Sequence, residues 1–225
     1  MNNEKIKIKE IFASIQGEGP YVGYKQLFVR FCNCNLKCNY CDTEFSSDKD
    51  FVEYDVCSLA EEINKYKDVH SVSLTGGEPL LSTDFLIKLL PKINKKIYLE
   101  TNATLSEKLI EVKPFIDYIS ADIKLESATG LKDTIKFHDK FFENCNGVET
   151  FAKIVFNENI TEEEVKNCCE LGKKYNIELI LQPEFKPNGK LSITSDFASE
   201  ILDKFLQNYE KVRLIPQVHK FLDVR

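Results

Sequence analysis

Apolar and polar positions along the chain predict strands and helices in turn. Short apolar runs bounded by turn residues predict buried strands, whereas Leu59, Ile63 and Tyr66 recur at helical spacing within residues 58–67 and predict an amphipathic helix. The repeated strand–helix units imply a parallel sheet with helices outside it. The predicted strands cover residues 26–32, 71–74, 96–100, 118–125, 150–156, 178–182 and 212–215, and the predicted helices cover residues 58–67, 84–93, 106–112, 132–143, 161–175 and 195–208.

This pattern predicts an α/β fold built as a partial, open parallel β/α barrel, because the helices are too few for a complete eightfold one. No linker, low-complexity tract or internal repeat interrupts it, so we expect a single domain over residues 1–225. The residues that could take part in catalysis or binding come just after the strand ends. Parallel strands place those ends on one rim, where such enzymes build their sites, and we therefore expect one continuous pocket.

Composition narrows the function classes. The chain has 225 residues, of which 43% are hydrophobic and 29% charged, as in an ordinary globular domain. The net charge of -6 argues against a general electrostatic grip on nucleic acid, and no apolar stretch reaches the length of a membrane span. The first residues are polar and lack the apolar core of a signal peptide. The eight cysteines therefore indicate a reducing cytoplasm and metal chemistry rather than disulfides.

The most informative motif is the C-x3-C-x2-C run of Cys34, Cys38 and Cys41, directly after the strand at residues 26–32. Three thiolates on one loop can hold three irons of a cubane iron–sulfur cluster and leave the fourth iron without a protein ligand. An open iron can bind a small molecule and pass an electron to it. We take residues 32–43 as the cluster loop.

A zinc site is the alternative interpretation of this loop, because Cys32 lies just upstream of Cys34. One residue separates these two cysteines, however, whereas zinc ligand pairs usually lie two to four residues apart. Cys32 also ends an apolar strand, where a small buried thiol is common in a core. The remaining cysteines and two of the histidines show no ligand spacing, and we expect them to be structural: Cys57, Cys145, Cys168, Cys169, His70 and His138.

Further motifs surround the cysteines. They are Gln16-Gly17-Glu18 within residues 14–20, Cys41-Asp42-Thr43, Thr75-Gly76-Gly77-Glu78-Pro79, Glu100-Thr101-Asn102 and the run Pro216-Gln217-Val218-His219-Lys220. With them the chain resembles, almost end to end, the 7-carboxy-7-deazaguanine synthase family of radical S-adenosylmethionine (SAM) enzymes. The resemblance implies a radical SAM barrel and a carbon–nitrogen lyase. Such a lyase converts 6-carboxy-5,6,7,8-tetrahydropterin to 7-carboxy-7-deazaguanine with loss of ammonia, in queuosine and 7-deazapurine biosynthesis.

The resemblance also implies three cofactors. Cys34, Cys38 and Cys41 would hold a [4Fe-4S] cluster whose fourth iron is chelated by SAM, and Thr43 would bind Mg²⁺. Without the resemblance, Thr43 would be a turn or helix-capping residue. Where the family pattern has Ser-Pro-Lys, this chain has Asp122-Ile123-Lys124. The implied SAM contacts are Tyr40, Gly76, Gly77, Glu78, Asn102, Asp122, Lys124 and Gln182.

Arg30 is one of only three arginines in a lysine-rich chain, and its guanidinium fork suits a substrate carboxylate. A strand-end arginine paired with a surface acid is the alternative. A tail over residues 216–225 is expected to fold over the substrate. The implied substrate contacts are Gln16, Gly17, Glu18, Arg30, Thr75, Gln217, His219 and Arg225.

The family further implies an external electron donor, flavodoxin- or ferredoxin-like, and a homodimer, with neither nucleic acid nor membrane as a partner. Two other functions stay open at this point. A glycyl-radical-enzyme activase shares the cysteine triplet but acts on a protein, and Gln16-Gly17-Glu18 and residues 216–220 argue against it. A non-catalytic zinc- or cluster-binding module is the other.

Overall fold

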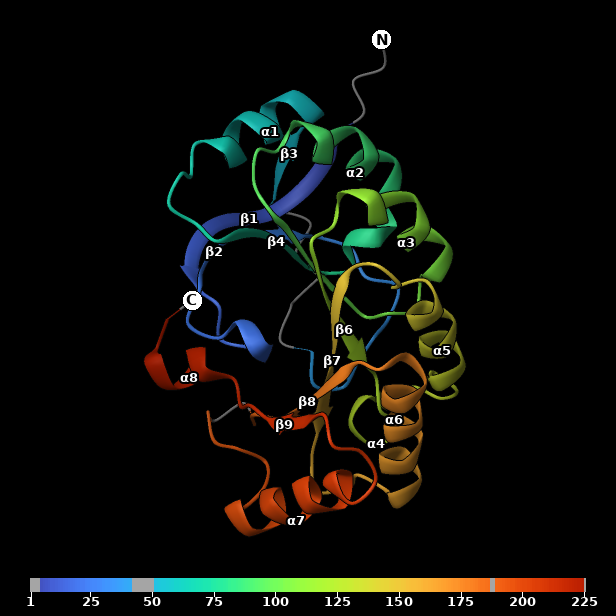
Figure 1. Cartoon of the computed structure of the whole chain (residues 1–225). Coiled ribbons are helices and arrows are strands. Elements are labelled where there is room, and N and C mark those ends of the chain that lie inside the picture. Colours follow the sequence, from blue (N-terminus) through green and yellow to red (C-terminus); the bar gives the residue numbers. More distant parts are fainter. Residues whose placement is uncertain (1–4, 42–50, 187–188, 225) are drawn as a thin grey trace.

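The computed structural model describes residues 5–41, 51–186 and 189–224. Within these residues the strands form a nine-stranded sheet in the order β3-β1-β2-β4-β5-β6-β7-β8-β9 (Figure 1). Neighbouring strands from β2 to β9 are parallel, whereas β1 is antiparallel to β2 and β3. The strands are β1 Ile6–Ile15, β2 Lys25–Phe31, β3 Val52–Tyr54, β4 Ser71–Gly76, β5 Ile97–Thr101, β6 Tyr118–Ile123, β7 Glu149–Phe156, β8 Glu178–Pro183 and β9 Val212–Leu214.

Helices lie along the outside of the curved sheet (Figure 1). Two of them begin with a capping box: Asp55 with Ser58 starts α1, and Thr161 with Glu164 starts α6. The described helices are α1 Val56–Asn64, α2 Thr83–Leu89, α3 Ser106–Val112, α4 Glu126–Thr129, α5 Ile135–Glu143, α6 Glu162–Tyr175, α7 Ser195–Leu206 and α8 Val218–Leu222. In the part of the chain that the structure describes, none of the helices has both the length and the apolar character to cross a bilayer.

The two faces of the sheet bury different residues. On β7, Ala152, Ile154 and Phe156 belong to the main core cluster. The alternate residue Phe151 instead belongs to a second cluster inside the curve of the sheet, because successive side chains of a strand point to opposite faces. We call this second cluster the aromatic floor; it consists of Tyr98, Tyr118, Phe151 and Ile180, with Tyr21 packed against it.

The open α/β barrel predicted from the sequence is confirmed, and all seven predicted strands are present as β2 and β4 to β9. The antiparallel strands β1 and β3 were not predicted. The alternation of Ile6 and Ile8 is broken by a register shift between Ile8 and Glu10, and β3 has only three residues. The irregularity in β1 and the shortness of β3 weaken the two-residue period that marks a strand.

Candidate active site

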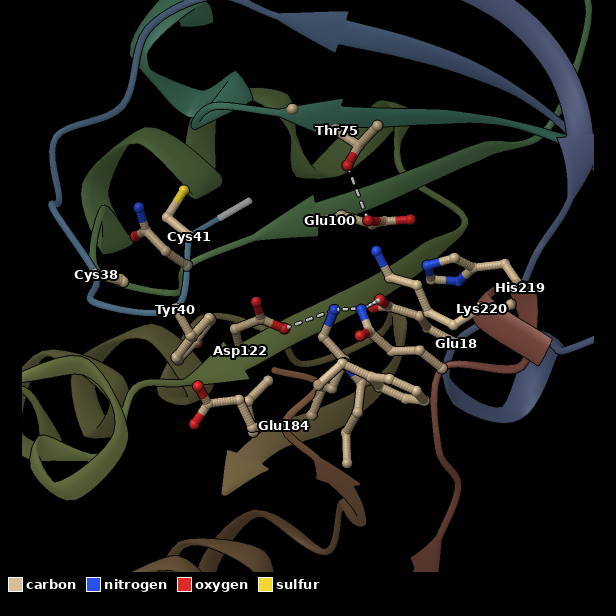
Figure 2. Close-up of a pocket in the computed structure, with 18 of the residues that line it drawn as sticks. Glu18, Cys38, Tyr40, Cys41, Thr75, Glu100, Asp122, Glu184, His219 and Lys220 are labelled. Atoms are coloured by element: carbon tan, nitrogen blue, oxygen red, sulfur yellow. Dashed lines mark hydrogen bonds and ion pairs between the residues drawn. The ribbon is translucent and has the colours of Figure 1, made fainter. Parts of the chain in front are cut away.

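The carboxyl ends of the parallel strands surround a cavity of about 620 Å³ (Figure 2). The structure therefore brings residues from both ends of the chain to one place. Two predicted site residues, Thr43 and Arg225, lie outside the described residues. The predicted residues that line the cavity are Gln16, Gly17, Glu18, Arg30, Cys34, Cys38, Tyr40, Cys41, Thr75, Gly76, Gly77, Asn102, Asp122, Lys124, Gln182, Gln217 and His219.

All three motif cysteines line one side of the cavity. The Cys34 sulfur accepts hydrogen bonds from the Leu36 backbone N–H at 3.5 Å and from Asn102 Nδ2 at 3.8 Å. Burial raises the pKa of the Cys34 and Cys38 thiols. Cys41 is exposed at the rim. N–H donors directed at a cysteine sulfur are a feature of cluster sites, where they stabilise the thiolate.

Gly77 allows the loop after β4 to pack backbone to backbone against the start of the cysteine loop. A Cβ at residue 77 would lie 2.0 Å from the Asn33 carbonyl oxygen. The two segments are joined by hydrogen bonds from Gly77 N to Phe31 O at 2.9 Å and from Glu78 N to Asn33 O at 2.7 Å. Glycine is thus required here by the protein's own backbone.

Glu78, predicted as a cofactor contact, is not among the residues that line the cavity. Its side chain is buried behind the wall, with the residue only 1% exposed. The carboxylate accepts hydrogen bonds from Leu80 N at 3.0 Å, Thr101 Oγ1 at 2.9 Å and Asn102 N at 2.8 Å. Burial raises the pKa of Glu78 to about 7. The three donors explain its orientation, because they would otherwise be buried without partners.

Beside the cysteines, Lys124 joins Asp122 and Tyr40. The Lys124 ammonium lies 2.8 Å from Asp122 Oδ2 and donates to the Tyr40 hydroxyl at 3.0 Å. Burial disfavours the charged lysine, yet Asp122, Tyr40 and Cys38 together outweigh it and hold the pKa of Lys124 above its usual value. Burial raises the pKa of Tyr40 to about 12, although Lys124 acts against this shift. The lysine is therefore a cation and the tyrosine is neutral at physiological pH.

His138 has the structural role that its sequence context predicts. Its Nε2 accepts a hydrogen bond from Lys124 N at 3.0 Å, and its Nδ1 lies 3.2 Å from the Ala103 carbonyl oxygen. Burial lowers the pKa of His138 to about 4. The neutral ring, protonated at Nδ1, satisfies both partners and joins the segments that follow β5 and β6.

On the opposite side of the cavity, Gln16 and Glu100 form a hydrogen-bonded group. Gln16 Nε2 donates to Gln26 Oε1 at 2.9 Å and to Glu100 Oε1 at 3.1 Å. Glu100 also accepts from Ser73 Oγ at 2.9 Å and from Thr75 Oγ1 at 2.8 Å, the latter bond drawn in Figure 2. Glu100 was noted only as part of a motif, but it lines the cavity and orients two of the predicted substrate contacts.

Glu18 is held by partners from distant parts of the chain. It forms a hydrogen-bonded ion pair with Lys153 on β7 and accepts from Gln217 Nε2 at 2.6 Å. Burial would raise the pKa of Glu18, but Lys153 and the bond from Gln217 together lower it to about 2. Lys153 was not predicted, although a lysine inside the apolar run of residues 151–156 is a signal that something pairs with it.

Arg30 lines the cavity, where a substrate contact is predicted, and it also pairs with an acid, as the alternative interpretation expects. Its Nε lies 3.0 Å from Glu10 Oε1 on β1. The guanidinium carbon lies 5.4 Å from the centroid of the Phe12 ring, which fits a cation–π contact. These two neighbours fix the plane of the guanidinium group at the edge of the cavity.

The tail after β9 returns to the segment that follows β1. Val218 N donates to the Gly17 carbonyl oxygen at 2.8 Å. A Cβ at Gly17 would lie 2.4 Å from His219 Nδ1, so glycine permits this approach. The Phe221 ring on α8 packs edge-on against Phe185 at a centroid distance of 5.5 Å. Lining residues that were not predicted include Lys220 and the loop after β8, with Glu184, Phe185 and Lys186.

The donor set fits an iron–sulfur cluster better than a zinc ion. Among the described residues, no three Cys, His, Asp or Glu side chains converge on a position for one metal ion, which is what a zinc site needs. In a cubane each thiolate binds a different iron. Cys32, half-buried, does not line the cavity. Gln182 Oε1 is a buried acceptor without a protein partner on the cavity wall, as expected where a cofactor supplies the donor.

Comparisons with known proteins agree with this geometry. The family model of the radical SAM superfamily matches residues 28–181. A curated 7-carboxy-7-deazaguanine synthase from Archaeoglobus fulgidus is 38% identical over 96% of this chain and 97% of that protein. The synthase from Geobacter sulfurreducens is 35% identical over 99% of both chains. The chain belongs to the 7-carboxy-7-deazaguanine synthase family.

Among solved structures, QueE from Escherichia coli covers 96% of this chain and 95% of its own, with a TM-score of 0.64 at 19% identity. A radical SAM methyltransferase from Sphaerobacter thermophilus gives a TM-score of 0.62 at 9% identity. At these identities the likeness concerns the fold. As a member of the 7-carboxy-7-deazaguanine synthase family, the chain is a radical SAM lyase that uses a [4Fe-4S] cluster and SAM. It acts on a small molecule and needs a reductant.

Proposed function

We propose that the cavity converts 6-carboxy-5,6,7,8-tetrahydropterin to 7-carboxy-7-deazaguanine with loss of ammonia, for queuosine and other 7-deazapurines. The observation that carries this proposal is that the predicted cluster ligands and the predicted substrate contacts line one cavity. Cys34, Cys38 and Cys41 line the same cavity as Gln16-Gly17-Glu18, on the segment before β2, and His219, near the other end of the chain. The names of the relatives support the same reaction.

On the cysteine side, Cys34, Cys38 and Cys41 would hold the cluster. When bound, the cluster and SAM supply a radical that can remove a hydrogen atom from an unactivated carbon. The Lys124–Asp122 pair offers charges of both signs to the ends of SAM. We assign the SAM contacts to Tyr40, Gly76, Gly77, Asn102, Asp122, Lys124 and Gln182, and give Glu78 the task of holding Asn102 in place.

On the other side, Arg30 would bind the substrate carboxylate through the face of its guanidinium not used by Glu10. The ionised Glu18 would accept N–H bonds from the pterin edge, while Gln16 and Thr75, oriented by Glu100, supply further polar contacts. Gln217 and His219 would close the site from the tail. These groups orient the substrate and exclude water.

Several finer points complete the proposal. Thr43 would bind Mg²⁺, which prefers oxygen ligands, and Arg225 would contact the substrate. We further propose that residues 1–225 act as one radical SAM domain, as a cytoplasmic homodimer, with a flavodoxin- or ferredoxin-like electron donor. The eight cysteines, all among the described residues, form no disulfide in the structure, which suits a reducing compartment.

The test is an anaerobic assay of the reconstituted chain with reductant, SAM and the tetrahydropterin, and with no partner protein. Formation of 7-carboxy-7-deazaguanine, identified by mass, is expected. A chain that turns over only when a partner protein is added would be an activase instead.

Cys38→Ala tests the assignment of the cluster ligands, and we expect this variant to lose both its bound iron and its formation of product. Cys57→Ala serves as the control because Cys57 is exposed and outside the cavity lining; it should keep both. Product formation by Cys38→Ala would refute the assignment of the cluster.

A further inference from the structure

Lys153 is the charged residue on β7 that projects into the cavity from the middle of a buried strand. Its side chain is 9% exposed. Along the same face of β7, Phe151 below it belongs to the aromatic floor and Val155 above it lines the cavity. A lysine buried at this depth is unfavourable unless acids compensate it.

Two acids from different parts of the chain compensate it. The Lys153 ammonium forms an ion pair with Glu18 and lies 3.3 Å from Asp122 Oδ1; the two acids are labelled in Figure 2. Asp122 is also its register partner on β6. Because Asp122 Oδ2 bonds Lys124, which bonds Tyr40, one chain of polar contacts runs from Glu18 to the cysteine loop.

We propose that Lys153 is a positioning residue for the substrate: its ammonium fixes the ionised Glu18 carboxylate toward the substrate and links it to Asp122 on the cofactor side. This inference rests on the proposed function, because it takes Glu18 as a substrate contact. It adds a residue that acts on the substrate through the Glu18 carboxylate, while Asp122 on the cofactor side has Lys124 as its other partner.

The consequence of removing Lys153 follows from the charges around Glu18. The tail brings Gln217 and His219 to it, while Glu100 and Asp122 face the same space from β5 and β6. Without the lysine, Glu18 would be a buried carboxylate among other acids, which favours its protonated form. A protonated Glu18 would offer a hydroxyl where the pterin edge needs an acceptor.

The experiment measures binding of 6-carboxy-5,6,7,8-tetrahydropterin by anaerobic calorimetry at several values between about pH 6 and pH 8.5, with wild type and Lys153→Met. Wild-type affinity should show no contribution from Glu18 titration, since the Glu18 pKa of about 2 lies far below this range. In Lys153→Met we expect affinity at least about tenfold weaker. The ratio of the two affinities should grow as the pH falls.

Further variants separate this role from a structural one. Lys153→Arg should restore most of the affinity and remove the pH dependence of the ratio, and Glu18→Gln combined with Lys153→Met should also be independent of pH. Lys174→Met, on the exposed surface of α6, should behave as wild type. If Lys153→Met does not fold, Lys153→Gln, which keeps an N–H donor, replaces it and should show the same trend more weakly.

Unchanged affinity in Lys153→Met, or a loss that is the same at every pH, would overturn the inference. Iron content and SAM cleavage without substrate should remain near wild type in the variant, and their loss would equally contradict a role limited to the substrate side. A wild-type chain that neither binds nor converts the tetrahydropterin would instead overturn the proposed function.

Discussion

Glu78 shows how a single side chain can serve the site without facing it. Its carboxylate takes three hydrogen bonds, two from backbone N–H groups and one from Thr101, in a place closed to water. One of the donors is the backbone of Asn102, whose side chain bonds the Cys34 sulfur. A motif can therefore contain a residue whose task is to hold the neighbouring contact residue in position.

Glu78→Gln should lower the free energy of unfolding by about 1 to 3 kcal/mol, because an amide N–H₂ would face buried N–H donors. Urea unfolding of the cluster-free chain measures this. Glu163→Gln, exposed in the first turn of α6, is the control and should change it by less than about 0.5 kcal/mol.

The pKa of Glu78 determines how the difference in the free energy of unfolding between wild type and Glu78→Gln depends on pH. Burial raises the pKa from 4.5 to about 7, so Glu78 binds a proton on folding between these values. Its contribution to stability is therefore largest at low pH and is lost as the pH rises through 7. The gap between wild type and Glu78→Gln should be wider at pH 5 than at pH 8. A gap that widens toward pH 8 would contradict a pKa of Glu78 raised by burial.

At the scale of elements, the contact between the loop after β4 and the cysteine loop admits no side chain at Gly77. A Cβ there would overlap the Asn33 carbonyl oxygen at 2.0 Å. Gly77→Ala should therefore displace the cysteine loop and reduce iron loading severely. We expect this loss from iron and sulfide analysis after reconstitution.

Gly147→Ala is the matched control for this substitution. A Cβ at residue 147 meets nothing within 4 Å, although its positive φ of 85° carries a backbone penalty of about 1 to 2 kcal/mol. This variant should be less stable but load iron as wild type does. Normal iron loading in Gly77→Ala would show that the cysteine loop does not depend on this backbone contact.

The parallel strands and the position of the cysteine loop could be predicted from the sequence, because apolar runs and motif spacing are local signals. Strand β1 could not be predicted in the same way, since the register shift between Ile8 and Glu10 breaks its period. The loop after β8 was also missed. Its Glu184 and Lys186 have the composition of any solvated loop, and only the fold places them at the cavity.

The partners of the predicted residues could likewise not be predicted from the sequence. The Gln16-Gly17-Glu18 motif gave the residues but not Lys153, which reaches Glu18 only after β6 and β7 pair in register. Glu78 illustrates the opposite case, because a motif indicates which residues belong together and not which of them faces the ligand.

At the scale of the whole molecule, the tail joins the last strand to the segment after β1. Deleting residues 221–225 removes the Phe221 contact with Phe185 and should loosen His219 over the cavity. We expect KM for the tetrahydropterin to rise about tenfold, because positioning of the substrate is lost. SAM cleavage without substrate should be unchanged.

Steady-state kinetics with both ligands measures this effect. Phe221→Leu, which keeps an apolar side chain at the same place, is the control and should lie close to wild type. Turnover and KM unchanged by the deletion would show that the end of α8 has no part in closing the site.

The aromatic floor has a consequence for the binding and release of ligands. Tyr98, Tyr118, Phe151 and Ile180 fill the interior below the cavity, with Tyr21 packed against them. Within the described part of the chain these packed side chains close that end of the cavity, so we expect both ligands to enter at the carboxyl ends of the strands. The ligand that binds deeper must then bind first and leave last. The aromatic floor would in this way impose an order of binding and release on the catalytic cycle.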